Sequence, residues 1–430
     1  MRRKHWLTWL LAVSLFVSLV GLTAVIKPQT AVASQKKQPV NITLWHAMTG
    51  PSEKALKTMV TDYNHSQSKV HVTALYQGNY GDLQKKIMAA GKSHTLPALG
   101  QLSYSAVPDL QSHQLIQPIT KLVNGKQGLS KKDLNDLYAT FTKNMKYKNA
   151  YYTTPLNKSP RLLFYNKDLL KKYNLSVPKT WQDVATDGAK VKQDNIAALG
   201  IDAGFDIEFA GIAQEFGSSI ISNNLKPQMN SKGPRAASAF FVDNIKKGAI
   251  KTAGSDKYYS GAFTQGKSLF YISSSSAIQA IKANASKGFN WGTAEMPANK
   301  SKRLSAVGGA DLMMFKGLSS AKQKAAWDFM KYSMSTKASA KWSQQSGYVP
   351  VRKSSVKLAS YKKYLKQNPA QQTAVDSLNI GVQQPTFKGY SAFRQDYITA
   401  IDDMFSLRKS PKQVLPDLQS KALAAQKNGD

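Results

Sequence analysis

The sequence predicts an α/β protein built as two lobes with a ligand cleft between them. Stretches with apolar residues at every second position alternate with longer stretches whose apolar residues recur every three or four, which indicates mainly parallel strands flanked by helices. A chain of 430 residues is long enough for more than one hydrophobic core. Ligands of such folds bind between domains and at the carboxyl ends of parallel strands.

The first hundred residues show the alternation most clearly. Strands are expected over 41–46, 69–76 and 97–103, because Ile42 and Leu44, and later Val70 and Val72, fall at period two. Helices are expected after a cap at Ser52 and over 81–91, 131–144, 165–173, 180–193, 235–247, 319–334, 336–344, 392–407 and 411–426, with a strand at 310–315. We expect residues 41–153 and 302–335 to form the first lobe, and residues 154–301 and 336–430 the second.

Residues 1–33 have the order of a secretory signal peptide: a basic head, an apolar run over 6–26, and the small residues Ala31-Val32-Ala33. A retained membrane anchor is the alternative, because about 20 apolar residues can span a bilayer. Residues 34–40 form a polar leader. The chain is therefore expected to be exported to the outer face of the membrane or to the cell wall. It has no cysteine, so it is not expected to be a lipoprotein.

The chain is strongly basic, with 59 Lys and Arg against 25 Asp and Glu. Residues 1–33 hold four of the basic residues and no acidic one, so cleavage would reduce the formal charge from +34 to +30. The lysines are scattered, without a basic helix or a nucleic-acid motif, so nucleic acid is not an expected partner. An anionic cell-wall polymer is a possible partner, and a solvated lysine-rich surface is the alternative.

Local motifs for catalysis are missing. The absence of cysteine rules out thiolate chemistry and Cys-ligated metals, and the histidines lack metal-ligand spacing. No nucleophile elbow, Walker loop or dinucleotide-binding motif occurs. We expect no enzyme, no catalytic residue, no metal and no cofactor.

Several segments read in order resemble the extracellular solute-binding proteins (family 1) of ABC importers. These segments are W-H-A-M-T-G (45–50), Q-G-N-Y (77–80), P-L-N-K-S-P-R-L-L-F-Y-N-K-D (155–168), P-K-T-W-Q-D (178–183), F-T-Q-G-K-S (263–268), V-G-G-A-D-L (307–312), W-S-Q-Q-S-G-Y-V-P (342–350) and S-P-K-Q-V-L (410–415). Within that family the combination is similar to members that bind glycerol 3-phosphate. The resemblance implies a type II periplasmic-binding-protein-like fold and lobe closure over the ligand.

The resemblance also implies a phosphate site. Its positions match Ser159, Ser274, Gly309, Tyr348 and Arg394 in this chain. A phosphate leaving water needs several N–H and O–H donors and preferably a guanidinium, and this set provides them. From the residues alone, Ser159 could instead shape a turn, and Arg394 could be a solvated surface charge.

At the polyol end, the resemblance implies contacts from Tyr80, Tyr104 and Trp181, and a place in the core is the alternative for Trp181. The family has a glutamate where this chain has Tyr104, so recognition of the polyol is expected to differ. The implied ligand is glycerol 3-phosphate or a related glycerophosphodiester, and an oligosaccharide is the alternative. The implied partners are the permease and ATPase subunits of an importer, with the chain itself a monomer. A basic surface protein of the cell wall is a further alternative.

Overall fold

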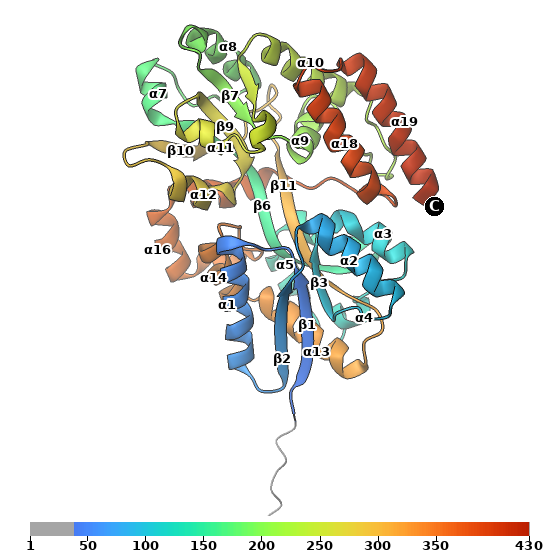
Figure 1. Ribbon diagram of the computed structural model, residues 1–430. Coiled ribbons are helices and arrows are strands. Elements are labelled where there is room, and N and C mark those ends of the chain that lie inside the picture. The colour runs from blue at the N-terminus through green and yellow to red at the C-terminus, as the bar shows by residue number, and fades with distance from the viewer. Residues whose placement is uncertain (1–37, 430) are drawn as a thin grey trace, which may run out of the picture. The chain divides into compact units, whose positions relative to one another are not determined.

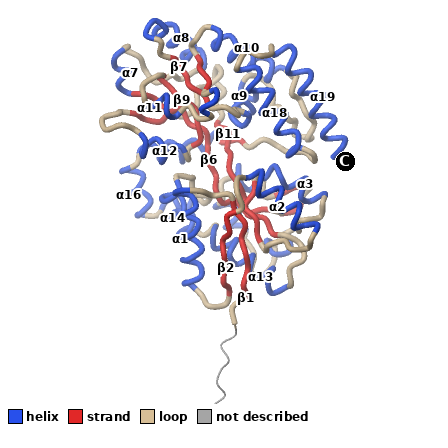
Figure 2. The backbone as a smooth tube through the Cα atoms, viewed as in Figure 1, coloured by secondary structure: helices blue, strands red, loops and turns tan. Residues whose placement is uncertain are grey.

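The computed structural model describes residues 38–429. A mixed ten-stranded sheet runs through both lobes, with its main path in the order β2-β1-β3-β11-β6-β9-β7-β8 (Figures 1 and 2). The strands are β1 (Val40–His46), β2 (Val70–Tyr76), β3 (Leu99–Leu102), β4 (Lys146–Tyr147), β5 (Ala150–Tyr151), β6 (Thr153–Asn166), β7 (Ala197–Ile201), β8 (Ile250–Thr252), β9 (Ser268–Ser274), β10 (Trp291–Ala294), β11 (Ser305–Met314) and β12 (Gly381–Val382).

Helices surround the sheet in both lobes. They are α1 (Gly50–Ser66), α2 (Tyr80–Lys92), α3 (Val107–Ser112), α4 (Thr120–Val123), α5 (Lys131–Asp136), α6 (Ala139–Lys143), α7 (Lys167–Lys172), α8 (Trp181–Val191), α9 (Asp206–Glu215), α10 (Lys232–Lys246), α11 (Ser260–Thr264), α12 (Ala277–Asn284), α13 (Ser320–Ser333), α14 (Thr336–Ser346), α15 (Lys353–Lys357), α16 (Ala359–Gln367), α17 (Pro369–Asp376), α18 (Tyr390–Phe405) and α19 (Pro411–Gly429), with a 3₁₀ turn η1 (Tyr104–Ala106). Among the described residues, no helix is long and apolar enough to cross a membrane.

Along the main path of the sheet, neighbouring strands are parallel at the two ends and antiparallel at the centre. β1 pairs in parallel with β2 and β3 in the first lobe, and β7 pairs in parallel with β8 and β9 in the second. Between them, β11 is antiparallel to β3 and β6, and β6 is antiparallel to β9. The two long strands β6 and β11 run up the middle of Figure 1 and join the lobes.

Two large apolar cores pack against the sheet, and the first extends from the first lobe to Phe263 and Tyr271 of the second. In the first, Leu44 on β1, Leu56 on α1 and Phe329 on α13 are fully buried together. In the second, Phe209 on α9 and Phe241 on α10 pack with residues of α18 and α19. The predicted two-lobe α/β architecture is confirmed.

Most predicted elements are present, with differences where the chain bends. The first helix begins at Gly50 after an N-cap at Thr49, not after Ser52, because Pro51 is tolerated in a first turn. The single helix expected over 131–144 is wrong. Residue Leu137 adopts an extended conformation between α5 and α6 and forms a bridge with Arg352. Residues 165–166, expected to begin a helix, end β6 instead.

Helix α14 lies against α1, where Lys341 pairs with Asp62 at 2.6 Å. Residues 336–346 therefore touch a helix of the first lobe, although the sequence assigned them to the second. The exact boundaries of the lobes stay a prediction.

A buried ion pair connects the two central strands. Lys158 Nζ lies 2.6 Å from Asp311 Oδ1, and the two side chains are 1% and 3% exposed. The ladder between β6 and β11 shifts register at Ala310/Asp311, beside this pair. Burial raises the pKa of Asp311, and the Lys158 ammonium opposes that rise. The pair is favourable only while both members are present.

We predict that Lys158→Met destabilises the protein by about 3–5 kcal/mol, because Asp311 would be left buried without its partner. Urea unfolding measures the loss. Lys172→Met is the matched control, because it removes an ion pair with Asp194 that is largely exposed, at 58% and 46%. The control should leave the unfolding midpoint nearly unchanged. Equal effects of the two substitutions would contradict the role given to the buried pair.

Candidate ligand-binding site

Three polar side chains lie on one face of β6, where this strand passes between the lobes. Asn157, Ser159 and Arg161 alternate along the strand and therefore point to the same side. They are 1%, 3% and 8% exposed. Buried polar groups need partners from the protein or from a ligand. This row is the starting point of the site.

Two glycines of β11 give this row its space. Gly308 pairs with Ser159 and Gly309 with Lys158. Gly309 has φ +117°, and a Cβ on it would lie 1.8 Å from the Asn157 carbonyl oxygen. A Cβ on Gly308 would lie 2.9 Å from Arg161 Nη1. The paired glycines therefore let the β6 backbone and the Arg161 guanidinium come close to β11.

The Tyr80 hydroxyl lies at the first-lobe end of the row. Gln101 Nε2 donates to the Tyr80 oxygen at 3.2 Å and to Asn157 Oδ1 at 2.7 Å, and Asn157 Nδ2 donates to the Tyr80 oxygen at 3.3 Å. Tyr80 opens α2 directly after β2, and Gln101 lies in β3, so both stand at the carboxyl ends of parallel strands. The surrounding side chains remove water from the Tyr80 hydroxyl and raise its pKa, although the ring is partly exposed, and the nearby Tyr348 adds to the rise. The phenol therefore remains a neutral donor.

Tyr348 joins the same cluster from the segment after α14. Val349 N donates to the Lys158 carbonyl at 2.9 Å, which places this segment beside β6. The Tyr348 ring stacks on Trp342 with centroids 5.7 Å apart and planes 4° apart. Burial raises the pKa of Tyr348 above its ordinary value. Hydrogen bonds with Asn157 and Ser52 and the charge of Arg161 only partly oppose this rise.

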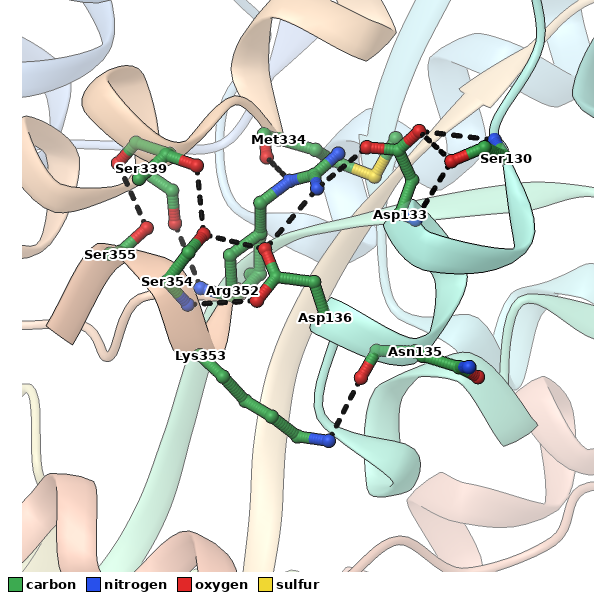
Figure 3. A network of polar contacts seen from close by, with 12 residues as sticks. Ser130, Asp133, Asn135, Asp136, Met334, Ser339, Arg352, Lys353, Ser354 and Ser355 are labelled. Carbon is green, nitrogen blue, oxygen red and sulfur yellow. Dashed lines mark hydrogen bonds and ion pairs between the residues drawn. The ribbon is translucent and has the colours of Figure 1, made fainter. Parts of the chain in front are cut away.

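A polar network anchored on Arg352 fixes the segment that carries Tyr348 (Figure 3). Arg352 donates to the Met334 carbonyl at 2.5 Å, to Asp133 at 3.0 Å and to Asp136 at 3.3 Å. Ser354 N and Oγ also donate to Asp136. The Ser130 hydroxyl and the Arg352 guanidinium keep the pKa of Asp133 below its ordinary value. This network holds the Tyr348 segment against α5 and α13.

Two arginines meet the N-terminal turn of α9, and each is anchored there by a carboxylate. Arg161 Nε donates to Glu208. Arg394, from α18, donates from Nε and Nη2 to Asp206 at 2.7 and 3.2 Å. Burial alone would lower the pKa of Arg394, but Asp206 and, less strongly, Glu208 raise it. Because Asp206 and Glu208 lie two residues apart in the first turn of α9, the two pairs form one cluster.

Ser274 belongs to the same face. It is the ladder partner of Arg161 in the antiparallel pair of β6 and β9, and directly opposed residues point to the same side of a sheet. Its hydroxyl lies 2.8 Å from Ser276 Oγ. Register places Ser159 and Ser274 on the face of Arg161 and Gly309 beside the same strand, and Arg394 reaches the helical turn that anchors Arg161, although the ligand roles of these residues and of Tyr348 stay a prediction.

The other two polyol-end residues lie elsewhere. The Tyr104 hydroxyl, in η1, donates to the Lys146 carbonyl at 3.0 Å, and burial raises its pKa to about 12. Trp181 is 2% exposed in the core of the second lobe, packed on Phe240 and Phe241. Its indole N–H donates to Glu215 at 2.8 Å. Trp181 has the position of a core residue rather than a pocket wall.

Five residues of this cluster were not predicted: Gln101, Asn157, Arg161, Asp206 and Glu208. Asn157 and Arg161 share the period of Ser159, so a strand assignment over 153–166 would have revealed them. The carboxylates had no local signal, because their arginine partners lie 47 and 188 residues away along the chain. No group of three or more His, Cys, Asp or Glu in residues 38–429 could hold a metal ion.

We predict that Gly309→Ala destabilises the fold, by about 1–3 kcal/mol from the backbone conformation alone and by more from the clash with β6. Thermal unfolding measures this loss. Gly248→Ala is the control, because Gly248 also has positive φ, at +77°, but no atom within 4 Å of its Cβ position. If the two variants lose the same stability, the close approach of β6 to Gly309 does not matter energetically.

Trp181→Phe is expected to cost about 1–3 kcal/mol, because a buried carboxylate loses one of its donors. Burial raises the pKa of Glu215 to about 7, so this group is charged in the folded protein only above that pH. The Trp181 N–H favours the charged form, so the loss should be larger at pH 8 than at pH 5.

Trp327→Phe is the matched control for this pH dependence. Trp327 is also buried, but its N–H donates to the Gln127 carbonyl at 3.2 Å, which does not titrate. Urea unfolding of both variants at the two pH values tests the difference. A pH-independent loss for Trp181→Phe would show that Glu215 is not its titrating partner.

Comparison with known proteins supports a binding role. The family model described as bacterial extracellular solute-binding protein matches residues 58–370. The sn-glycerol-3-phosphate-binding periplasmic protein UgpB of Yersinia pestis is 25% identical over 406 residues, covering 87% of this chain and 89% of that protein. The protein of the same name from Brucella abortus is 25% identical over 398 residues, covering 88% of each.

Solved structures share the fold at lower identity. The cyclic α-maltosyl-1,6-maltose binding protein of Arthrobacter globiformis superposes with a TM-score of 0.79 at 21% identity, covering 91% of this chain and all of that one. UgpB of Mycobacterium tuberculosis, in complex with glycerophosphocholine, also gives 0.79 at 21% identity, covering 91% and 98%. These relatives are binding proteins and not enzymes. The chain belongs to the bacterial extracellular solute-binding proteins and has their two-lobe type II fold.

Proposed function

We propose that this exported solute-binding component of an ABC importer captures glycerol 3-phosphate or a related glycerophosphodiester. The observation that carries the proposal is the pair of guanidinium groups, Arg161 and Arg394, held beside a row of hydroxyl donors. Glu208 anchors Arg161 through Nε, and Asp206 anchors Arg394 through Nε and Nη2, so the N–H groups not used in these bonds are left to meet a ligand. Guanidinium groups anchored in this way match the oxygens of a phosphate group.

The remaining donors complete a phosphate site. Ser159 lies on the same face of β6 as Arg161, and Ser274 lies directly opposite Arg161 on β9. The charge of Arg161 lowers the pKa of Tyr348, which is a third hydroxyl donor. Gly309 allows a backbone approach that a side chain would block. Each charge-assisted hydrogen bond would contribute about 1.5–3 kcal/mol.

The polyol would meet neutral groups in the first lobe. The Tyr80 hydroxyl, Gln101 and Asn157 already form a hydrogen-bonded triad that can donate to and accept from hydroxyl groups. Tyr104 remains a proposed contact at this end. Trp181 is left out of the proposal because it lies in the core.

An oligosaccharide is the second candidate. Structural neighbours named as a cyclic α-maltosyl-1,6-maltose binding protein and as a sugar-binding protein share the fold as closely as the phosphate-ester binder does. The carboxylates Asp206 and Glu208 could accept sugar hydroxyls. Exposed aromatic rings at the end of β2 and the start of α2, Tyr76 at 48% and Tyr80 at 39%, could stack on sugar faces.

Delivery of a small solute to membrane permease and ATPase subunits follows from the family. A monomeric state and retention at an anionic cell-wall polymer remain proposals, the latter supported by the +34 formal charge of the full chain. The proposed signal peptide over 1–33 lies outside the described residues.

We predict that Arg394→Gln and Arg161→Gln each weaken binding of a phosphate ester by about tenfold to a hundredfold, the loss of one charge-assisted contact. Calorimetric titration with glycerol 3-phosphate, glycerophosphoglycerol, inorganic phosphate and maltose measures the affinities.

Arg408→Gln is the matched control, because Arg408 pairs with Asp403 at 2.8 Å on the surface, away from this cluster. It should bind like the unaltered protein. Binding of maltose without any phosphate ester would replace the proposal by the oligosaccharide candidate. Unchanged phosphate-ester affinity in both site variants would show that the ligand binds elsewhere.

A further inference from the structure

The two arginines of the proposed site are neutralised by their own anchors. Arg161 and Arg394 bring two positive charges, and Glu208 and Asp206 bring two negative charges within hydrogen-bonding distance. Both carboxylates are buried, at 8% and 2% exposure, so water screens them little. The cluster therefore offers many N–H donors but no surplus positive charge.

A third buried carboxylate, Asp202, lies on the opposite face of β9 from Ser274, because its partners Tyr271 and Ser273 alternate with Ser274 along the strand. Asp202 follows β7 and accepts from the Tyr271 hydroxyl at 2.9 and 3.0 Å, from Ser273 Oγ at 3.1 Å and from Tyr259 N at 2.8 Å. Burial raises the pKa of Asp202 to about 6, and the Glu208 charge contributes to the rise. Asp202 therefore lies outside the row of Arg161, and the charge balance of the site rests on the two anchored arginine–carboxylate pairs.

The anchoring geometry leaves donors available in spite of this charge balance. Asp206 accepts hydrogen bonds from Nε and Nη2 of Arg394, whose side chain is 39% exposed. Glu208 occupies Nε of Arg161, and the Ser159 carbonyl lies 3.5 Å from Nη1. The outer guanidinium N–H groups can therefore bind phosphate oxygens while their charge stays compensated by the carboxylates.

Ligand charge then decides the affinity. A phosphate monoester carries a charge of about −1.5 to −2 at pH 7, because its second pKa is near 6. Esterification of a second oxygen removes that ionisation and leaves a single charge. A buried charge without compensation is costly, so each additional negative charge on the ligand is penalised in a site with no positive surplus.

We infer that Glu208 and Asp206 make this site select singly charged phosphate esters over doubly charged ones. The inference rests on the proposed function, because it concerns the same site. It assigns Glu208 as a specificity-determining residue that acts through Arg161 and need not touch the ligand.

The test compares two ligands that differ in one ester bond. Calorimetric titration of the purified protein at pH 7.5 uses glycerol 3-phosphate as the monoester and glycerophosphoglycerol as the diester. We expect the diester to bind more tightly. In Glu208→Gln, whose amide oxygen can still accept from Arg161 Nε, the monoester should gain about tenfold more affinity than the diester, because one nearby negative charge is gone.

Glu295→Gln is the matched control. Glu295 also pairs with an arginine, Arg303 at 2.8 Å, but each side chain is 33% exposed and the pair contacts Lys179 rather than the site. This variant should keep the ligand preference of the unaltered protein. Thermal unfolding of both variants establishes that they are folded, and a misfolded Glu208→Gln is replaced by Asp206→Asn, for which the same shift is expected.

Three outcomes would overturn the inference. The unaltered protein could bind the monoester as tightly as the diester, or Glu208→Gln could change both affinities equally, or Glu295→Gln could reproduce the shift. Each of these leaves the proposed function standing, because phosphate esters still bind. Failure of the unaltered protein to bind either ester overturns the proposed function itself, together with the inference.

Discussion

The antiparallel pair of β6 and β11, with the buried Lys158–Asp311 ion pair between them, is the constraint on which the structure depends. These strands are the central neighbours of the sheet and extend into both lobes. The ion pair is 2.6 Å long and almost inaccessible to water, so any slip of one strand along the other would separate two buried charges. The same strands carry Asn157, Ser159 and Arg161 on one face and the two glycines opposite them. A displacement at the strand pair would therefore reach the ligand face directly.

Local sequence signals predicted most of the fold because most elements follow their own periodicity. Strand β1 and helices α10, α13 and α18 lie close to their predicted bounds. The central strand β6 was missed because Pro155 and Pro160 interrupt its sequence, and proline normally argues against a central strand. Pro155 is accommodated next to the register shift at Asp311, a feature that depends on the partner strand and has no signal in residues 153–166. The break at Leu137 has the same kind of cause, because it depends on a bridge to Arg352.

The candidate site was predictable only where a resemblance carried residues over. The resemblance pointed to Ser159, Ser274, Gly309, Tyr348 and Arg394, and strand register places the first three on the face of Arg161 or beside its strand. It did not point to Arg161, Glu208 or Asp206, whose meeting requires β6, α9 and α18 to be packed first. For Trp181 the resemblance suggested a pocket wall, but a large ring with one N–H is equally suited to a core that contains a carboxylate acceptor, and Glu215 provides it. Long-range packing, rather than residue type, decides between such roles.

The shared fold accounts for the likeness to both phosphate-ester and sugar binders, and in the proposed site the charge around the paired arginines is what would distinguish their ligands. An arginine without a carboxylate presents donors and a full positive charge, whereas an arginine anchored by a carboxylate presents donors with that charge compensated. Hydroxyl-rich ligands and phosphate esters both need donors, but only the latter bring negative charge into the site. In the proposed site, the discriminating variable is therefore the net charge of Arg161, Arg394, Asp206 and Glu208 taken together, and not the number of hydrogen bonds they offer. Glu208 pairs with Arg161 and lies two residues from Asp206, the partner of Arg394, in the first turn of α9, so this one helical turn holds both compensating charges.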